Sequence, residues 1–313
     1  MSLYFYQHLP ECISPIAFTI GRVEVSWYGI MYLIAFAIVY FLVRYRIKRK
    51  ETSITLETVQ DFFPWAIVGL LLGARLGDVI IYNWPYFSAH PLEIFLPFDV
   101  HNHWQYIGIY GMSYFGGLLG LAIAFVIFSF LRFNLKNPPP LPEGRCPSKF
   151  SKKILVDGEV GAIGRLWSNT LNFTDLFAPA IPLGCAFGRL GNFINGELYG
   201  RITTAPWGMY FPLDITGRLR HPSQLYEMFL EGILLFVILW YLRKYKSPTG
   251  YLTSFYLIGY GLARFTAEFF RQPDNDWFFL SLTLGQWFSV GIISLGIVII
   301  SSQKNPQVID RNL

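Results

Sequence analysis

An arginine, two asparagines and a glutamate lie among glycines in residues 188–201, which read GRLGNFINGELYGR. This segment starts where an apolar run, residues 176–190, comes to its end. An ionised side chain at membrane depth costs a few kcal/mol unless an opposite charge compensates it, and glycines let a large group approach the backbone. The anion that a bilayer supplies is a lipid phosphate. The sequence therefore predicts that Arg189 binds a phosphate.

A second cationic group lies further along the chain. Arg264, Glu268 and Arg271 are spaced four and three residues apart in an apolar run, so they share one face of a helix. One carboxylate between two arginines leaves a net positive charge, and we expect Arg264 to meet the same anion. Purely structural pairing is the alternative, and it is an equally good interpretation for Arg75 and Asp78, three residues apart in an earlier run.

Histidines offer proton transfer or metal binding. His221 begins the motif HPSQLYE, and its ordinary pKa near neutrality would let it accept a proton; the alternative is that it only orders the loop. His101 and His103 form an H-x-H pair without further ligands nearby, whereas a zinc site needs three or four ligands. We therefore expect neither a metal site nor a cofactor.

Composition places these residues in a membrane. Hydrophobic residues make up 53% and charged residues 14% of the 313 residues, whereas a soluble domain has about 25% charged residues. Seven apolar runs approach the ~20 residues that a spanning helix needs. They are residues 27–43, 62–82, 107–131, 173–190, 225–242, 251–270 and 278–301. The sequence predicts an all-α membrane protein, a polytopic bundle of about seven transmembrane helices in a single domain, 1–313.

The fourth run is interrupted by four residues: Asp175, Pro179, Pro182 and Arg189. Broken helices are tolerated at membrane depth only where they are buried in protein or line a cavity, so we expect this helix to line the site. The loops also predict an orientation, because 17 of the 25 Lys and Arg residues fall on one side of the seven runs. By the positive-inside rule that side is cytoplasmic.

The amino terminus and residues 191–223 are then outside, and the carboxyl terminus is cytoplasmic. Residues 134–167 are rich in proline and mixed charges, which is typical of a solvated loop, and we expect a cytoplasmic insertion there. The net charge of +5 follows from this topology and from anionic headgroups, and we expect no nucleic-acid partner.

At this point the motifs resemble a known family. Residues 188–201 resemble the signature of phosphatidylglycerol–prolipoprotein diacylglyceryl transferases, and the resemblance runs from about residue 13 to residue 301, apart from the insertion. Other similar blocks are residues 27–29, 73–77, 221–227, 259–264 and 268–273. The resemblance implies a multi-pass enzyme of the bacterial cytoplasmic (inner) membrane whose site opens toward the outer face.

The resemblance also implies a reaction. An sn-1,2-diacylglyceryl group passes from phosphatidylglycerol to the cysteine thiol of a prolipoprotein lipobox, forming a thioether and releasing glycerol 1-phosphate. The nucleophile belongs to the substrate, so the enzyme needs no catalytic Ser or Cys. The implied phosphatidylglycerol-binding residues are Arg189, Arg264, Asn195 and Gly200. The implied catalytic residues are Arg264, Asn192, Glu197 and Tyr28, and we add His221 as a proton acceptor.

One position departs from the family pattern. The family has a histidine before the Gly-Gly of the third run, and this chain has Phe115 there. Either another group accepts the thiol proton (Tyr114, His103, His221 or Glu197), or no protein base is needed, or activity has been lost. In the last case the chain would be a non-catalytic anionic-lipid-binding protein or a transporter.

Overall fold

The computed structural model describes residues 3–21, 23–81, 83–95, 98–99, 105–106, 113–132, 164, 166–245, 247–273 and 278–303. The chain divides into two compact units, one made of Met1–Ser53 with Leu171–Leu313 and the other of Ile54–Thr170. Both units are mostly helical, and the described strands form three two-stranded antiparallel sheets.

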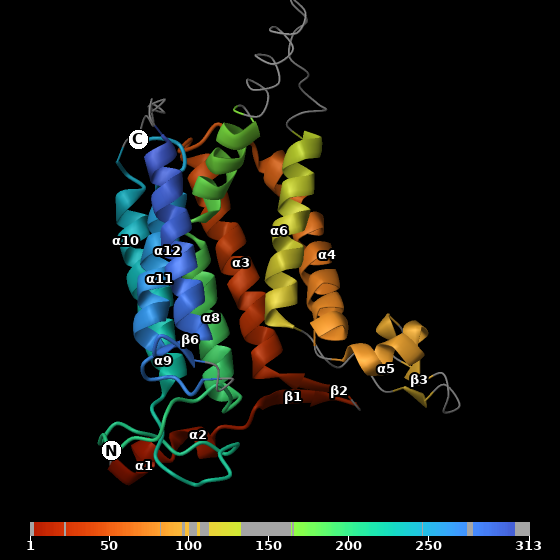
Figure 1. Cartoon of the computed structure of the whole chain (residues 1–313), viewed down its shortest axis with the longest axis vertical. Helices are drawn as coiled ribbons and strands as arrows, with labels where there is room; N and C mark the ends of the chain where they lie inside the picture. Colours follow the sequence, from red (N-terminus) through yellow and green to blue (C-terminus); the bar gives the residue numbers. More distant parts are fainter. Residues whose placement is uncertain are drawn as a thin grey trace, which may run out of the picture. The chain divides into compact units, whose positions relative to one another are not determined.

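The unit Ile54–Thr170 is built on two long helices, α4 (Leu56–Ile81) and α6 (Tyr114–Phe130), which run side by side (Figure 1). Small residues recur every four positions on the facing surfaces: Gly69, Gly73 and Gly77 on α4, and Gly116, Gly120 and Ala124 on α6. A Cβ added to Gly120 would lie 2.1 Å from the Gly69 carbonyl oxygen. The two backbones therefore touch, as small residues permit in membrane helices.

Shorter elements follow α4. They are α5 (Trp84–Ala89), the 3₁₀ helix η1 (Pro91–Ile94), and the paired strands β3 (Phe98–Asp99) and β4 (Gln105–Tyr106). The predicted Arg75–Asp78 pair is present only at 4.0 Å. The Arg75 guanidinium instead donates to the backbone carbonyls of Glu93 and Ile94 at 2.8 and 2.7 Å, so Arg75 mainly holds η1 against α4.

The other unit begins with α1 (Leu3–Gln7), α2 (Leu9–Cys12) and the hairpin of β1 (Ile16–Ile20) and β2 (Val23–Ser26). Its helices are α3 (Trp27–Lys48), residues 171–177, α8 (Ile181–Ile194), α9 (Ser223–Glu227), the π-helical η3 (Met228–Leu234), α10 (Leu235–Leu242), α11 (Tyr251–Ala267) and α12 (Leu284–Ser302). A hairpin of β5 (Phe278–Phe279) and β6 (Leu282–Thr283) precedes α12.

Helix α8 packs on α3 and on η3 through small residues. Gly191 lies beside Tyr28 of α3, where an added Cβ would be 3.3 Å from the tyrosine ring. Gly232 of η3 meets Ala186, and an added Cβ there would be 2.6 Å from the alanine Cβ. This close approach brings the side chains of α8 within reach of those on the helix that starts at Ser223.

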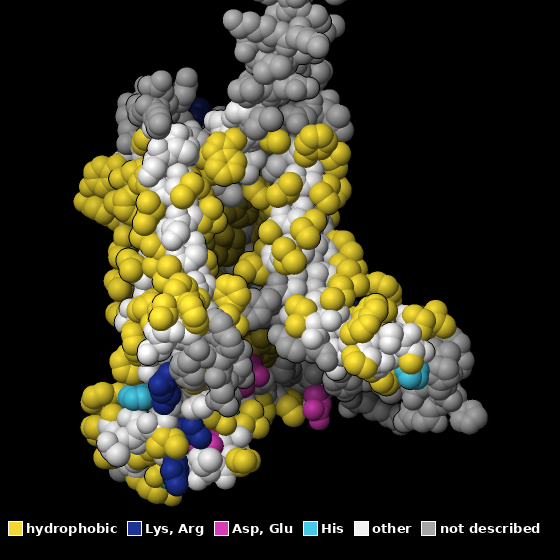
Figure 2. All heavy atoms as spheres, viewed as in Figure 1, with side chains coloured by type: hydrophobic (Ala, Val, Ile, Leu, Met, Phe, Trp, Pro, Cys, Tyr) yellow, Lys and Arg dark blue, Asp and Glu magenta, His cyan; other side chains and the backbone are white. Residues whose placement is uncertain are grey.

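Four described helices are long and apolar enough to cross a membrane: Trp27–Lys48, Leu56–Ile81, Ser223–Leu242 and Leu284–Ser302. Figure 2 shows hydrophobic side chains over the lengths of the helices, with charged side chains gathered near α9 and the loop that precedes it. The mostly helical membrane architecture is confirmed, whereas the count of seven spans and their orientation stay predictions.

Two helices begin inside the predicted runs. In the run at 107–131, α6 begins at Tyr114, because the Ser113 side chain accepts from the Gly116 N–H at 3.1 Å and caps the helix there; residues 107–112 lie outside the described part of the chain. The run at 278–301 starts as a hairpin, and α12 begins after Thr283, whose side chain forms a capping box with Gln286. The insertion at 134–167 lies almost wholly outside the described residues.

The contact between α4 and α6 yields a first prediction. Gly120→Ala should lower the melting temperature in detergent micelles, because the new Cβ meets the Gly69 carbonyl backbone and the helices must separate. Gly117→Ala is the control: its Cβ would sit 3.4 Å from Ala74, an ordinary contact, and alanine favours a helix over glycine by about 1 kcal/mol. Equal melting temperatures for the two variants would contradict the close packing.

Candidate functional site

Three arginines and three glutamates meet in one buried ion-pair network. The members come from α8, from α9 and η3, and from α11 with the turn that follows it. They are Arg189, Glu227, Glu231, Arg264, Glu268 and Arg271. All six belong to the same compact unit.

Glu227 is the centre of this network. Its two carboxylate oxygens lie 2.8 Å from Arg189 Nη1 and 2.6 Å from Arg264 Nη1, and Arg271 Nε lies 3.9 Å away. Glu231 approaches Arg189 Nη2 at 3.2 Å and Arg264 Nη1 at 3.7 Å. Glu227 thus joins the guanidinium groups of α8 and α11.

The predicted face of α11 is confirmed, since Arg264 Nη2 lies 3.1 Å from Glu268 Oε2 and Arg271 Nη1 lies 4.0 Å from the same oxygen. The expected single carboxylate between the arginines is joined by two more, because Glu227 and Glu231 bring the network to three arginines and three glutamates. Arg189 has no acid nearby in the sequence, yet it has two in space, supplied by the helix that starts at Ser223.

The glutamate side chains at the centre of the network are more deeply buried than the arginine side chains that pair with them. The side chains of Glu227 and Glu231 are each 1% exposed, whereas those of Arg189 and Arg264 are 18% and 13% exposed. Buried carboxylates are tolerated only when they are paired. The guanidinium groups therefore form the accessible face of the site, and planar groups with several N–H donors suit a phosphate ligand.

Local backbone features hold these groups in place. The stretch η3 is π-helical from Met228 to Leu234, and π-helical turns inside α-helices often occur at functional sites. Gly285 leaves room for the Glu268 carboxylate, since an added Cβ would be 2.8 Å from its Oε1. The Thr283 hydroxyl donates to that oxygen at 3.1 Å, so the start of α12 orients Glu268.

Tyr28, Asn192 and Glu197 form a second group of polar side chains at the carboxyl-terminal end of α8. Asn192 Nδ2 donates to Glu197 Oε1 at 2.8 Å. The Tyr28 hydroxyl hydrogen-bonds with the Asn192 side chain and donates to Tyr32 Oη at 3.1 Å. Gln224 Nε2 donates to the Glu197 carbonyl at 2.5 Å. Helix α9 therefore fixes the loop that carries Glu197 through Gln224, three residues before Glu227.

Gly200 fastens the same loop to the end of α11. Its N–H donates to the His221 carbonyl at 2.8 Å, and it forms a β-bridge with Arg271. A Cβ at this position would lie 2.4 Å from the Phe270 carbonyl oxygen, so no other residue fits without movement of the backbone. Gly200 thus holds this loop against the end of α11, and its part in phosphatidylglycerol binding stays a prediction.

His221 lies beside these contacts and is half-buried. Its Nδ1 is 3.1 Å from the Tyr226 hydroxyl, and its ring packs edge-on against Phe270. Burial lowers the pKa of His221 below its ordinary value near 6.5, so the ring is neutral at pH 7 and able to accept a proton. Ser223 does not cap α9; its hydroxyl donates to the Leu198 carbonyl at 2.9 Å.

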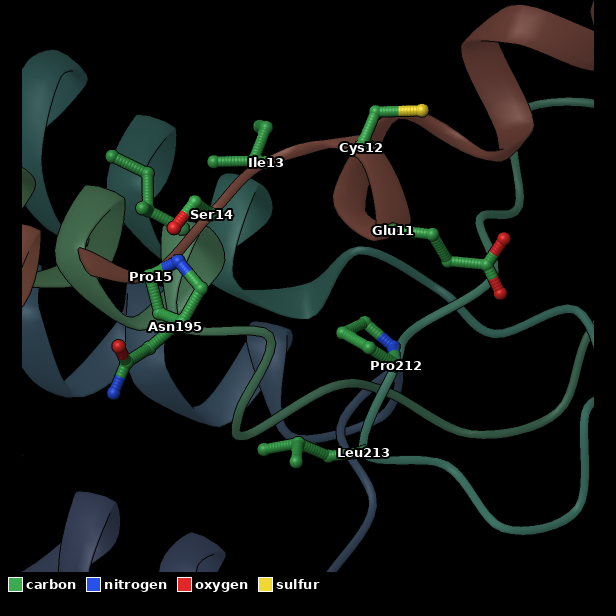
Figure 3. A pocket seen from close by; sticks show the side chains of 9 residues that line it. Glu11, Cys12, Ile13, Ser14, Pro15, Asn195, Pro212 and Leu213 are labelled. Carbon is green, nitrogen blue, oxygen red and sulfur yellow. The ribbon is translucent and has the colours of Figure 1, made fainter. Parts of the chain in front are cut away.

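Asn195 lies apart from the ion-pair network. It follows the last turn of α8 and lines a cavity of about 460 Å³ with residues of the amino-terminal segment and of the loop around Leu213. Figure 3 shows Asn195 on one side of this cavity and Glu11, Cys12, Pro212 and Leu213 around the rest. The structure thus places Asn195 at this cavity, and its contact with the headgroup stays a prediction.

Some candidate residues fall outside what the structure describes. His101 and His103 are among the undescribed residues, and the side chains of Tyr114 and Phe115 are undescribed although both belong to α6. Sequence reasoning gave no role to Glu227 or Glu231. The available signal was a pair of carboxylates four residues apart in an apolar run, which is costly unless cations on another helix meet it.

Comparisons with known proteins agree with the motifs. A family model described as prolipoprotein diacylglyceryl transferase matches residues 15–138 and 160–302. A phosphatidylglycerol–prolipoprotein diacylglyceryl transferase from Chlorobaculum tepidum is 42% identical over 303 residues, which cover 96% of this chain and 93% of that protein. Proteins of the same name from Bordetella parapertussis and Coxiella burnetii are 40% and 39% identical, covering 91% and 94% of this chain and 93% and 95% of their own lengths.

The network yields a second prediction. Glu227→Gln should lower the free energy of unfolding by about 3–5 kcal/mol, because it leaves buried arginine charge uncompensated. Glu24→Gln is the matched control, since Glu24 is exposed on β2 and should change stability by less than about 0.5 kcal/mol. Thermal unfolding of both variants in the same detergent measures the difference. Similar losses would mean that Glu227 does not hold the network together.

Proposed function

The chain belongs to the prolipoprotein diacylglyceryl transferase family, and we propose that its buried network of arginines and glutamates is where the transfer takes place. The protein is a transferase of lipoprotein maturation that acts with phosphatidylglycerol and prolipoproteins. One observation carries the proposal: the guanidinium groups of Arg189 and Arg264 are partly exposed, and Glu227 pairs with both. Arg189 belongs to the segment 188–201 that resembles the family signature.

The chemistry sets three tasks. The thiolate of the lipobox cysteine attacks the glyceryl carbon, a C–S bond forms, and the C–O bond to the phosphate breaks. The bonding electrons stay on the phosphate oxygen of the departing glycerol 1-phosphate, and the thiol proton passes to a base. The protein must therefore bind the phosphate, stabilise the charge that develops on it, and favour the thiolate.

Arg189 and Arg264 perform the first two tasks in this proposal. Arg189 binds the phosphate of the headgroup, and Arg264 stabilises the leaving oxygen. Ion pairs with Glu227, Glu231 and Glu268 fix both guanidinium planes before the substrate arrives. Such preorganised donors require no reorganisation as charge develops, which is the main source of electrostatic catalysis.

Tyr28, Asn192, Glu197 and Gly200 shape the wall of the site, and His221 accepts the thiol proton. The half-buried, neutral imidazole supports His221 over the other candidates, Tyr114, His103 and Glu197. A cysteine thiol has an ordinary pKa near 8.5, so a few per cent is thiolate at neutral pH even without a base. The lack of the family histidine at Phe115 is therefore compatible with activity.

The proposal also includes the number and orientation of the membrane-spanning helices. The chain spans the bacterial inner membrane about seven times as one domain, with residues 191–223 at the outer face and residues 134–167 in the cytoplasm. The charge asymmetry of the loops supports this orientation. Residues 191–223 hold Asn192, Asn195, Glu197, Gly200 and His221, so the site opens outward, where the lipobox of an exported precursor emerges.

The headgroup assignment yields a third prediction. Arg189→Ala and Arg189→Lys should each lower the release of glycerol phosphate from phosphatidylglycerol, in the presence of a lipobox peptide, by on the order of 10²–10³. Lysine fails because a point charge does not reproduce the forked guanidinium contact. Arg218→Ala, on an exposed loop, should retain activity. Near-normal turnover with lysine at 189 would refute the forked contact, and glycerol phosphate release without peptide would refute the transfer.

The base assignment yields a fourth prediction. The native protein should transfer lipid to a lipobox peptide, and its kcat/KM should stay level around neutral pH and fall on acidification, with the break below the ordinary histidine pKa of 6.5. The direction follows from the lowered pKa of His221, which keeps the ring neutral until the pH drops under that pKa. His221→Ala should remove this acid limb and lower the plateau by ~10²-fold or more. An unchanged pH profile would mean that Tyr114, His103 or Glu197 accepts the thiol proton instead. Tyr114→Phe, His103→Ala and Glu197→Gln test these three residues in turn.

The orientation yields a fifth prediction. In a variant without native cysteines, Arg218→Cys should react with a membrane-impermeant maleimide added to intact cells. Arg145→Cys, within the proposed cytoplasmic insertion, should react only after the membrane is opened. The reverse labelling pattern would place the site on the cytoplasmic face and overturn the proposed topology.

A further inference from the structure

A second cavity lies at the other ends of two of the helices that form the site. Helix α3 runs from Tyr28 to its carboxyl-terminal end near Lys48, and the helix that carries Glu227 ends at Leu242. The two carboxyl-terminal ends enclose a cavity of about 330 Å³. Its lining is Tyr45, Arg49, Glu51, Trp240, Arg243 and Lys244.

Glu51 is the only carboxylate among the described lining residues, and it is already paired twice. Arg46 Nε donates to Glu51 Oε2 at 2.9 Å, and Arg243 Nη1 forms an ion pair with Glu51 Oε1. Arg46 also donates to the backbone carbonyls of Asp175 and Leu176. Glu51 is thereby committed to the buried arginines and does not balance Arg49 or Lys244.

The charges around the cavity do not cancel. Three of the lining residues, Arg49, Arg243 and Lys244, are cations, and they face one carboxylate. Each of the two helix carboxyl-termini adds the equivalent of about half a negative charge. About one positive charge therefore remains at the cavity. A cavity with this excess is suited to an anion.

Aromatic rings hold the cations in fixed positions. The Arg243 guanidinium carbon lies 3.9 Å from the centre of the Trp240 ring, and that of Arg49 lies 5.4 Å from the centre of the Tyr45 ring. The Tyr45 and Trp240 rings stack at 6.0 Å. Trp and Tyr at the end of a spanning helix are typical of the headgroup level of a bilayer, which places the cavity where lipid phosphates lie.

Apolar surface leads away from the cavity along both helices. Phe41 lies one turn before Tyr45 on α3, and Val237 lies one turn before Trp240 on α10; both side chains are exposed. Acyl chains of a lipid whose headgroup occupied the cavity would cover this surface. Free phosphate carries the same kind of negative charge but has no acyl chain to cover this apolar surface.

We propose that this cavity binds the phosphate group of an anionic phospholipid from the leaflet opposite the transferase site. Arg49 and Lys244 contact the phosphate, Arg243 supports it from its stack on Trp240, and the acyl chains lie along Phe41 and Val237. The site has no part in the transfer. It ties the carboxyl-terminal ends of α3 and α10 to one leaflet, and it does not depend on the function proposed above.

The test compares two double variants of the full-length protein in detergent. Arg49→Gln with Lys244→Gln removes two charges from the cavity, whereas Lys48→Gln with Lys50→Gln removes two charges from exposed neighbours outside its lining. Native mass spectrometry counts bound lipids during titration with phosphatidylglycerol or phosphatidylcholine, and a third arm adds inorganic phosphate as competitor.

The native protein and the Lys48/Lys50 control should bind one more phosphatidylglycerol than the cavity variant does. Each lost cation should weaken that binding roughly five-fold, and phosphatidylcholine should not occupy the site. Displacement by millimolar phosphate would identify a free anion as an equal ligand of the same cavity. Equal counts in the native protein and the cavity variant, or equal losses in both double variants, would overturn the proposal. If the cavity variant unfolds, Lys244→Gln alone supplies the same comparison against Lys48→Gln.

Discussion

The arrangement of the helices in the unit Met1–Ser53 with Leu171–Leu313 depends on the carboxylate of Glu227. It is 1% exposed and lies within 4 Å of three arginines that come from different parts of the chain. A buried carboxylate cannot stay ionised without such partners, and the arginines cannot stay at membrane depth without it. The helices that carry these residues are therefore held at the distance that this shared pairing allows.

Several unusual backbone features follow from that constraint. Gly232 lets η3 touch Ala186, which sets the separation across which Arg189 reaches Glu231. Gly285 clears space for the Glu268 carboxylate. The fourth apolar run breaks before α8, and Arg189 and Asn192 share the carboxyl-terminal half of that one helix. None of these features favours a regular helix, and each places or makes room for a member of the site.

The sequence predicts the helices well because apolar runs and caps act locally. It predicts the face shared by Arg264, Glu268 and Arg271 for the same reason, since spacing along one helix determines which side chains are neighbours. The partners of Arg189 could not be predicted in this way, because Glu227 and Glu231 lie 38 and 42 residues further along the chain. Asn195 shows the converse: proximity in the sequence suggested a shared role, yet the turn after α8 directs it to another cavity.

The charge balance of the network bears on how a transferase of this kind turns over. A lipid phosphate diester carries one negative charge, whereas the departing glycerol phosphate is a monoester that approaches two charges at pH 7. A site with excess positive charge would hold this product more tightly than the substrate. If the transfer takes place at this network, as we propose, ionised glutamates would repel the additional charge while the guanidinium forks still meet the charge that develops in the transition state. Binding is then stronger for the transition state than for the product that follows, which is the condition for rapid turnover.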